Sequence, residues 1–475
     1  MSMLMQRLEG TAKDPRGAGA DAPSLTDTSR ASDTLAELRF RLHDKLVKQM
    51  DVSKLAGRDK SELRQHVEDA ARTLLAAEEV ALAREERARL IDEIADEVLG
   101  LGPIEPLLED PTITEVMVNR PDQVYFERGG VLHLSDRTFR DHDHIMRIIE
   151  KIVAPIGRRI DESSPMVDAR LPDGSRVNCI IPPLAVDSPT ITIRKFARDP
   201  LKVQDLIAYG SLTPEIAQLL QACVIARLNI VISGGTGSGK TTLLNVLSGW
   251  IPETERVVTI EDPTELQLRQ PHVVRLETRP PNVEGKGAVA TRDLVRNALR
   301  MRPDRIIVGE VRSGEAFDML QAMNTGHDGS LTTVHANSPR DAIARIENMV
   351  LMAGFELPIR AIREQIASAI HLVVQVSRLR DGSRRVTQIS EISGMEGQVV
   401  TMQDIFVFDQ QGVDERGKVI GAIRSTGLRP KFSDRLEAMG VALAPEIFMG
   451  DRLAAFAAPH HVSNWAPSLS ARMRT

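Results

Sequence analysis

The run from Gly234 to Thr242, GGTGSGKTT, has the residue types and spacing needed to hold a phosphate group. Glycines let several backbone N–H groups converge on one phosphate, and the start of a following helix adds partial positive charge. In such a pattern Lys240 reaches the β- and γ-phosphates, and the Thr241 hydroxyl is a ligand for Mg²⁺. The sequence therefore predicts a site for a nucleoside triphosphate. Its predicted members are Gly234, Gly235, Thr236, Gly237, Ser238, Gly239, Lys240, Thr241 and Thr242.

The residues on either side of this loop predict the elements that such a site requires. The apolar run 229–233 is typical of a buried strand, and 243–247 is typical of a helix. The alternative is a Gly-rich turn with an exposed lysine. That alternative gives no reason for a strand before the loop and a helix after it. We therefore favour phosphate binding.

Acidic residues follow two other strand-like runs, and hydrolysis needs such groups near the phosphate. Glu261 follows the apolar run 257–260, and Glu310 follows 306–309. Because the carboxyl ends of parallel strands meet at one edge of a sheet, both carboxylates should lie beside the loop. A carboxylate there holds the Mg²⁺ shell or orients the attacking water. We expect Glu310 and Glu261 to be catalytic, with Thr241 and Glu261 near the metal; solvated strand ends are the alternative.

Two histidines lie at or near a third strand. His335 ends the run 331–334, and His327 lies in the Gly-rich loop before that run. We expect His335 to sense the γ-phosphate, whereas a functional and a structural role are equally open for His327. No His or Cys pair has the spacing of a zinc site, so we expect no structural zinc.

Three arginines lie outside the phosphate-loop region. Arg170 and Arg176 flank the turn at Asp173-Gly174, and Arg194 ends the next predicted strand. Phosphoryl transfer uses positive charge on the γ-phosphate. These arginines would supply this charge if their domain contributes them to a nucleotide bound between domains. The alternative is a basic hairpin in solvent.

Composition limits the class of protein. Of the 475 residues, 42% are apolar and 27% are charged, as in soluble globular proteins. The net charge of −6 and the aromatic content of 3% disfavour nucleic acid as a partner. No apolar run approaches the roughly 18 residues of a membrane span, and the N-terminus lacks the apolar core of a signal peptide. We expect a cytoplasmic protein with its two cysteines, Cys179 and Cys223, buried as small apolar residues.

The pattern of the sequence changes along the chain and predicts domain limits. Residues 1–30 lack periodicity and are expected to be disordered, and helical spacing follows over 31–110. Short strands, hairpin turns and one helix over 111–198 predict an α+β domain, followed by a linker at 199–213. From 214 to 430 strand-like runs alternate with helical patterns, which is typical of a mostly parallel sheet. Residues 431–475 are expected to form a variable tail.

Four segments resemble the boxes of the secretion-superfamily ATPases. These are Gly234–Thr242, Thr259–Pro263, Leu299–Glu310 and Met323–Asn337. They are similar, in order, to the Walker A, Asp, atypical Walker B and His boxes of type II secretion, type IV pilus and type IV secretion motors. The resemblance implies an α/β fold with a RecA-like motor domain, preceded by an α+β domain and a small helical unit. It also implies ATP and Mg²⁺ as ligands and Glu310 as the residue that activates water.

Other segments resemble one branch, the CpaF-type ATPases of Tad (tight adherence, or Flp) pili. They are Gly102–Pro111, Asp168–Asn178, Gly394–Gly397 and Gln403–Phe408. The sequence also lacks the four-cysteine zinc insertion of the type II secretion branch. This resemblance implies a homohexamer with nucleotide between the two domains, associated with inner-membrane platform proteins. Arg170, Arg176 and Arg194 match the arginine positions of the family.

Four alternatives differ in what they require of the sequence. A type IV secretion traffic ATPase shares the same boxes and is the closest rival. A DNA-translocating motor is disfavoured by the acidic net charge and the few aromatics. A GTPase is disfavoured because no N-K-x-D motif follows the phosphate loop. A non-catalytic scaffold is disfavoured because the acidic and histidine boxes are intact.

Overall fold

The computed structural model describes residues 38–46 except 40 and 44, and residues 59–449 except 79, 81, 197–199, 282–284 and 442. The disorder expected over 1–30 lies outside the described residues, as does the part of the expected tail (431–475) that follows residue 449. The chain divides into two compact units, Met1–Phe196 and Ala197–Thr475. The finer domain limits expected from the sequence stay predictions.

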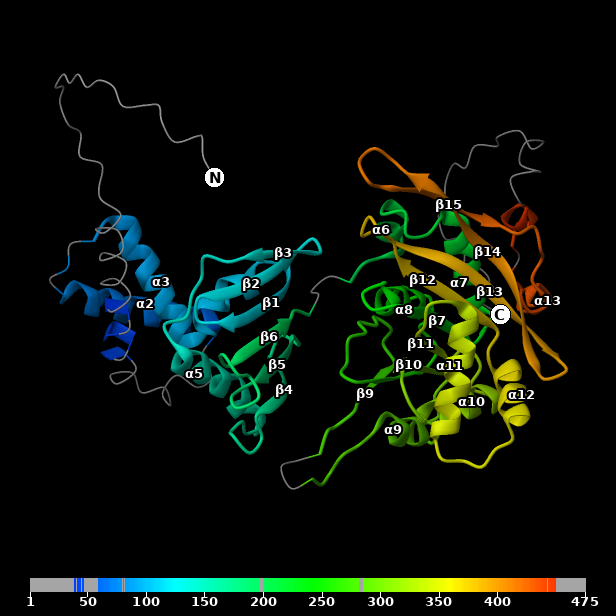
Figure 1. The fold of residues 1–475 in the computed structure, drawn as a ribbon, viewed down its shortest axis with the longest axis horizontal. Coiled ribbons are helices and arrows are strands. Elements are labelled where there is room, and N and C mark those ends of the chain that lie inside the picture. The colour runs from blue at the N-terminus through cyan, green and yellow to red at the C-terminus, as the bar shows by residue number, and fades with distance from the viewer. Residues whose placement is uncertain are drawn as a thin grey trace, which may run out of the picture. The chain divides into compact units, whose positions relative to one another are not determined.

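The first unit begins with helices and continues as an antiparallel sheet (Figure 1). Helices α2 (Lys60–Ala76) and α3 (Arg84–Leu99) share a core with Leu38, Leu42 and Leu46. Two short helices, η2 (Gly102–Ile104) and α4 (Glu105–Glu109), lead into a six-stranded sheet of order β3–β2–β1–β6–β5–β4. The strands are β1 Ile113–Arg120, β2 Gln123–Arg128, β3 Val131–Leu134, β4 Met166–Arg170, β5 Arg176–Ile180 and β6 Thr190–Arg194.

One amphipathic helix covers this sheet. Helix α5 (His142–Val153) is followed by η3 (Ala154–Ile156), and Asp141 caps α5 by accepting from the backbone N–H of His144. Isoleucines recur along α5 at helical spacing and pack on alternate residues of the strands, such as Val116 and Ile193. The predicted α+β architecture and its two hairpins, β2–β3 and β4–β5, are confirmed.

The second unit is built on a nine-stranded sheet of order β15–β14–β13–β12–β7–β11–β10–β8–β9. The five pairings from β12 to β9 are parallel, and those from β12 to β15 are antiparallel. The strands are β7 Ile230–Gly234, β8 Val257–Glu261, β9 Val273–Glu277, β10 Arg305–Val311, β11 Leu331–His335, β12 Leu372–Arg378, β13 Arg384–Glu396, β14 Val399–Val413 and β15 Val419–Ser425.

Helices cover both faces of the parallel part, so successive strand residues enter different cores (Figure 1). Ile230 and Ile232 pack with α7 and α8, whereas Val231 packs with α9 to α12. The helices are α6 Val203–Ala208, α7 Pro214–Ile225, α8 Lys240–Ser248, α9 Thr291–Ala298, α10 Glu315–Asn324, α11 Pro339–Met352, α12 Ile359–Ala369, α13 Ser433–Ala438 and η4 Pro445–Phe448. The predicted α/β class, with a phosphate-loop domain after an α+β domain and a small helical unit, is confirmed.

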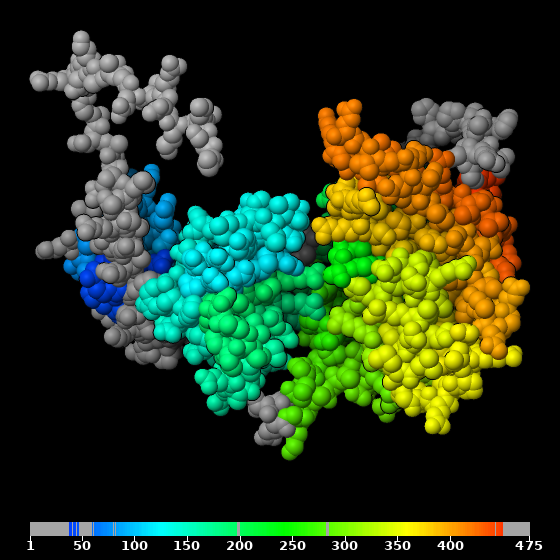
Figure 2. Space-filling view, in the orientation of Figure 1, coloured from blue at the N-terminus to red at the C-terminus, as the bar shows by residue number. Residues whose placement is uncertain are grey.

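The sheet extends further than the sequence suggested. β13 and β14 have 13 and 15 residues, and the far ends of β14 and β15 (orange) project from the second unit (Figure 2). β9 was not predicted at all. Both cysteines are buried, as expected. No helix in the described ranges is long and apolar enough to cross a membrane.

Candidate nucleotide site

The phosphate loop joins a fully buried strand to a helix in the second unit. β7 ends at Gly234, and α8 begins at Lys240. Gly237 and Gly239 have φ angles of 67° and 98°, which glycine adopts without steric cost. A Cβ atom on Gly234 would lie 2.5 Å from the Ser238 Oγ atom and would overlap the Val376 carbonyl oxygen. The loop therefore has a backbone reason for glycine at three of its positions.

Lys240 is held over this loop. The side chain is largely buried, and its Nζ atom donates to the Gly235 carbonyl oxygen over 3.0 Å. Burial lowers the pKa of the Lys240 ammonium, and the nearby Glu310 carboxylate opposes this shift. An ammonium whose shorter hydrogen bond goes to a neutral backbone carbonyl is well suited to take phosphate oxygens as partners.

A chain of side-chain contacts links the loop to Glu310. Parallel pairing of β11 with β7 sets His335 opposite Gly234. The His335 Nε2 atom lies 2.8 Å from the Thr236 Oγ1 atom, and its Nδ1 atom lies 3.0 Å from a Glu310 carboxylate oxygen, Oε1. Loop, histidine and carboxylate are thus joined within one unit.

The position of the His335 proton follows from its neighbours. The Nδ1 atom also lies 3.4 Å from Lys240 Nζ, which can only donate. Nδ1 cannot accept from Lys240 while it donates to Glu310. Since the Glu310 contact is shorter and Lys240 already has the Gly235 oxygen, we assign the proton to Nδ1. Nε2 then accepts from the Thr236 hydroxyl.

The environment of Glu310 favours its charged form. Burial would raise the pKa of this carboxyl, but hydrogen bonds from Arg312 and His335, together with the charges of Arg312 and Lys240, lower it. Arg312 donates to the Glu310 Oε2 atom through Nε over 3.0 Å and Nη2 over 2.7 Å. Arg312 was not singled out from the sequence; it follows directly after the last residue of β10, two positions beyond Glu310.

Glu261 ends β8, next to β10, and is only 3% exposed. Its Oε2 atom accepts from the backbone N–H groups of Glu265 and Leu266 over 2.7 and 2.9 Å. Burial raises the pKa of Glu261, and these two hydrogen bonds oppose the shift. The other oxygen, Oε1, is buried without a hydrogen-bond partner among the described residues.

The residues fit the Mg²⁺ ion that the sequence implies. Thr241 follows Lys240 in the first turn of α8 and offers a hydroxyl, and Glu261 offers the unpartnered oxygen Oε1. Hydroxyl and carboxylate oxygens are ligands that Mg²⁺ prefers, with water and phosphate oxygens completing its shell. Among the described residues, no group of three or more His, Cys, Asp or Glu side chains could hold a metal by itself.

The three predicted arginines lie in the first unit and form a row. Arg170 on β4 is paired in register with Arg176 on β5, which is paired with Arg194 on β6. Directly opposite residues in an antiparallel sheet have their side chains on the same face. The sequence predicted the residues but not their alignment.

Two further arginines beside the phosphate loop were missed by the sequence analysis. Arg384, the first residue of β13, donates from Nε to the Gly237 carbonyl oxygen over 2.8 Å. Arg378 ends β12, and its Nη1 atom lies 3.9 Å from the position of a Cβ atom on Gly237. The sequence feature that could have identified these two arginines is the Asp381-Gly382 turn, which lies between the two strands that carry them. Asp381 fixes that turn by accepting from Ser383 and from the backbone N–H of Val419.

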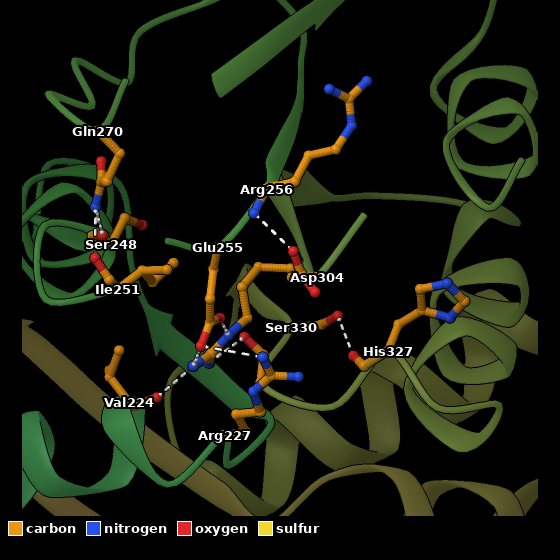
Figure 3. Close-up of polar contacts among 12 residues, drawn as sticks. Val224, Arg227, Ser248, Ile251, Glu255, Arg256, Gln270, Asp304, His327 and Ser330 are labelled. Atoms are coloured by element: carbon orange, nitrogen blue, oxygen red, sulfur yellow. Dashed lines mark hydrogen bonds and ion pairs between the residues drawn. The ribbon is translucent and has the colours of Figure 1, made fainter. Parts of the chain in front are cut away.

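His327 lies away from this site. It precedes β11, whereas His335 ends it, so the two histidines lie at opposite ends of one strand. Figure 3 shows His327 near a buried polar cluster around Glu255 and Arg227, where Ser330 donates to the His327 carbonyl oxygen. The centre of this cluster is Arg305, which is fully buried and paired with Glu255. The structure therefore places His327 away from the nucleotide site, with its main-chain carbonyl in contact with Ser330.

Two family models match successive parts of the chain. Residues 97–420 match the family model described as "Type II/IV secretion system protein", and residues 35–99 match "Type II secretion system protein E, N-terminal domain". A putative conjugal transfer protein of Mycobacterium tuberculosis is 40% identical over 309 residues, which are 64% of this chain and 87% of the relative. The type IV secretion system protein VirB11 of Bartonella quintana is 33% identical over 338 residues, or 63% and 93% of the two chains. The crystal structure of the VirB11 ATPase of Brucella suis, in complex with sulphate, has 32% identity and a TM-score of 0.33, and the match covers 60% of this chain and 94% of that one.

Proposed function

Because this chain belongs to the type II/IV secretion system protein family and is an ATP hydrolase, we propose that the site around Lys240 and Glu310 is where it hydrolyses ATP. The observation that carries this assignment is the chain of contacts from Thr236 through His335 to Glu310. It joins a phosphate-binding loop to an ionised carboxylate, and these are the two parts that hydrolysis requires.

The phosphate loop binds and orients the nucleotide. Backbone N–H groups of the loop and of the first turn of α8 receive the β-phosphate. Lys240 exchanges the Gly235 carbonyl for β- and γ-phosphate oxygens and neutralises part of their charge. When bound through Thr241 and Glu261, Mg²⁺ supplies further positive charge to the same phosphates.

Glu310 acts on the attacking water. Its lowered pKa keeps the carboxylate ionised at neutral pH, so that it accepts a proton from the water as the oxygen attacks the γ-phosphorus. The bond from the γ-phosphorus to the β-phosphate oxygen breaks, leaving ADP and phosphate. His335 senses whether nucleotide is bound, because its ring contacts both the phosphate loop and Glu310.

The test of this assignment is Glu310→Gln. The amide keeps the shape of the side chain but cannot take the proton, so ATP binding should persist while turnover falls by orders of magnitude. Nucleotide binding and steady-state phosphate release would be measured on the full chain. Turnover at the parent rate would refute the role of Glu310.

We further propose that the chain is the homohexameric motor of a Tad-type pilus. The segments 394–397 and 403–408, in β13 and β14, resemble that branch. The match of residues 35–99 to the N-terminal domain of type II secretion protein E also supports a pilus or type II machine. The partners would be inner-membrane platform proteins, placing the motor at the cytoplasmic face of that membrane.

A type IV secretion traffic ATPase is the second candidate. Its support is the identity with a putative conjugal transfer protein and with VirB11. Deletion of the gene in the source organism separates the two. Loss of surface fibres with unchanged conjugation supports the pilus motor, and the reverse result supports the traffic ATPase.

A further inference from the structure

Both oxygens of the Glu310 carboxylate accept hydrogen bonds. His335 Nδ1 occupies Oε1 at 3.0 Å. Arg312 occupies Oε2 with two nitrogens, Nε at 3.0 Å and Nη2 at 2.7 Å. Hydrogen bonds between charged partners are among the stronger ones in proteins. A water that gives its proton to Glu310 has to compete with these donors.

The two donors differ in how firmly they are held. His335 is fixed by strand register opposite Gly234 and by its contact with Thr236. The Arg312 main chain is also fixed, since Glu315 Oε1 accepts from the backbone N–H groups of Arg312 and Ser313. The Arg312 side chain is instead 61% exposed. Its guanidinium can therefore leave Glu310 without disturbing packing.

A bound guanidinium makes Glu310 a weaker base. The hydrogen bond from Arg312 contributes to lowering the pKa of this carboxyl, and a carboxylate with a lower pKa takes a proton from water less readily. Release of Arg312 raises the basicity of Glu310 and exposes Oε2 to water. Both effects favour proton transfer.

A second carboxylate lies within the electrostatic reach of Arg312. The hydrogen bond to Glu310 raises the pKa of Arg312 most, and attraction to Asp262 adds to the rise. Asp262 is an exposed residue directly after β8, the strand that pairs with β10. Thr278 donates to Asp262 Oδ1 over 2.5 Å, which fixes the carboxylate beside the site.

We propose that Arg312 is a releasable restraint on Glu310, which moves between Glu310 and Asp262 and thereby sets the unstimulated rate of ATP hydrolysis. Arg312 is a positioning residue in this scheme and acts through Glu310. The inference rests on the proposed role of Glu310 in activating water.

The test compares Arg312→Ala with the parent in the full chain. Removal of the restraint should raise the unstimulated kcat by up to about tenfold, the factor that corresponds to about 1.4 kcal/mol, with little change in KM. The acid limb of the kcat profile should move to higher pH, because Glu310 loses Arg312 while His335 and Lys240 remain as the groups that lower its pKa. Arg312→Lys, which keeps the charge, should give an intermediate rate.

Asp262→Asn tests whether Asp262 is the second partner of the Arg312 side chain. It should lower kcat in the parent but have no effect when combined with Arg312→Ala. Arg360→Ala is the matched control, because Arg360 is an exposed arginine paired with Glu364 away from the site. This variant should behave as the parent.

Two further results separate this proposal from the assignment of the site. Arg312→Ala combined with Glu310→Gln should be inactive if the added turnover passes through Glu310. An unchanged or lower kcat in Arg312→Ala, or an unmoved acid limb, would overturn the restraint. Normal turnover in Glu310→Gln alone would instead overturn the assignment on which the restraint depends.

Discussion

Arg170, Arg176 and Arg194 stand opposite one another across β4, β5 and β6. Glu115 on β1 continues the row, because it is paired in register with Arg194 and its Oε1 atom lies 3.8 Å from Arg194 Nε. Arginine is the residue that recognises phosphate through a planar, forked set of donors. We propose that this row acts on the γ-phosphate in the assembled motor.

Arg176→Ala, at the centre of the row, should cut ATP turnover by as much as about 10³- to 10⁵-fold while leaving nucleotide affinity nearly intact. The reason is that an arginine acting on the γ-phosphate contributes mainly in the transition state. Phosphate release and nucleotide binding are the measurements. Arg120→Ala is the control, since Arg120 is an exposed arginine of the same unit paired with Asp187.

Parental turnover in Arg176→Ala and also in the triple variant of the row would leave the arginines without a role in hydrolysis. A proportional loss of binding and turnover would assign them to ground-state affinity instead.

The residues of the site were predictable to the extent that their signals were local. Lys240 and Glu310 stand in short motifs that also predict the strands beside them. Arg384 and Arg312 were missed because their roles depend on pairing and side-chain direction. Arg384 contacts Gly237, 147 residues away in the chain, only because β12 pairs with β7. The position of His327 was also not predictable, because it depends on which end of β11 lies at the site.

At the scale of elements, the amino-terminal ends of the parallel strands are joined by buried polar side chains. Arg305, at the start of β10, donates to Glu255 over 2.5 Å and to the Val224 carbonyl over 2.9 Å (Figure 3 shows Val224 and Glu255). Asn229, before β7, accepts from the backbone N–H groups of Gly329 and Ser330. Because each of these contacts joins different elements, the base of the sheet is one connected network.

Gly329→Ala should destabilise the second unit by about 2 kcal/mol or more. Gly329 has a φ of 82°, and an added Cβ would overlap the Arg305 guanidinium and lie 3.0 Å from Arg227 Cα. Urea unfolding measures the effect. Gly326→Ala is a matched control in the same loop, because Gly326 has a φ of 95° but nothing within 4 Å of the added Cβ. Equal losses in both variants would show that only backbone strain matters there.

His371 should make this network sensitive to acid. It accepts from the Asn229 backbone N–H at Nδ1, and its Nε2 atom lies 3.1 Å from Arg435 Nη1. Burial, followed by the charge of Arg435, lowers the pKa of His371 to about 4. An unfolded histidine has a pKa of about 6.5, so between pH 6.5 and 4 the unfolded chain binds more protons. Stability is therefore complete above pH 6.5 and is lost as the pH falls toward 4, by about 3 kcal/mol at most.

Urea unfolding at pH 7 and pH 5 would measure this loss, with His371→Gln as the comparison. The variant starts from a lower stability but should lose less of it between the two pH values. The same pH dependence in parent and variant would assign the acid sensitivity to other groups.

The elements themselves were predicted where a single segment carried the pattern. The continuous apolar run of β7 and the turn at Asp173-Gly174 needed no distant information. β9 was missed because its residues are mostly half-buried at the edge of the sheet. The length of β13 and β14 depends on their pairing with each other and with β15, which no local pattern reveals.

At the scale of the whole molecule, a homohexamer implies that activity depends on assembly. ATPase activity per chain should rise with protein concentration, in step with the hexamer fraction measured by light scattering. Undiminished specific activity in a chain that stays monomeric at every concentration would refute this prediction.

β11 has only five residues, and both of its ends are fixed. His335 at one end contacts the phosphate loop, and Ser330 just before the other end is bound by Asn229, which itself donates to the Ala369 carbonyl over 2.7 Å. Buried networks with satisfied partners resist local deformation. We therefore expect the centre of the second unit to deform little during the ATP cycle. We expect this part to move as a rigid body. Each hydrolysis event would then directly displace its surface relative to the surfaces that it contacts.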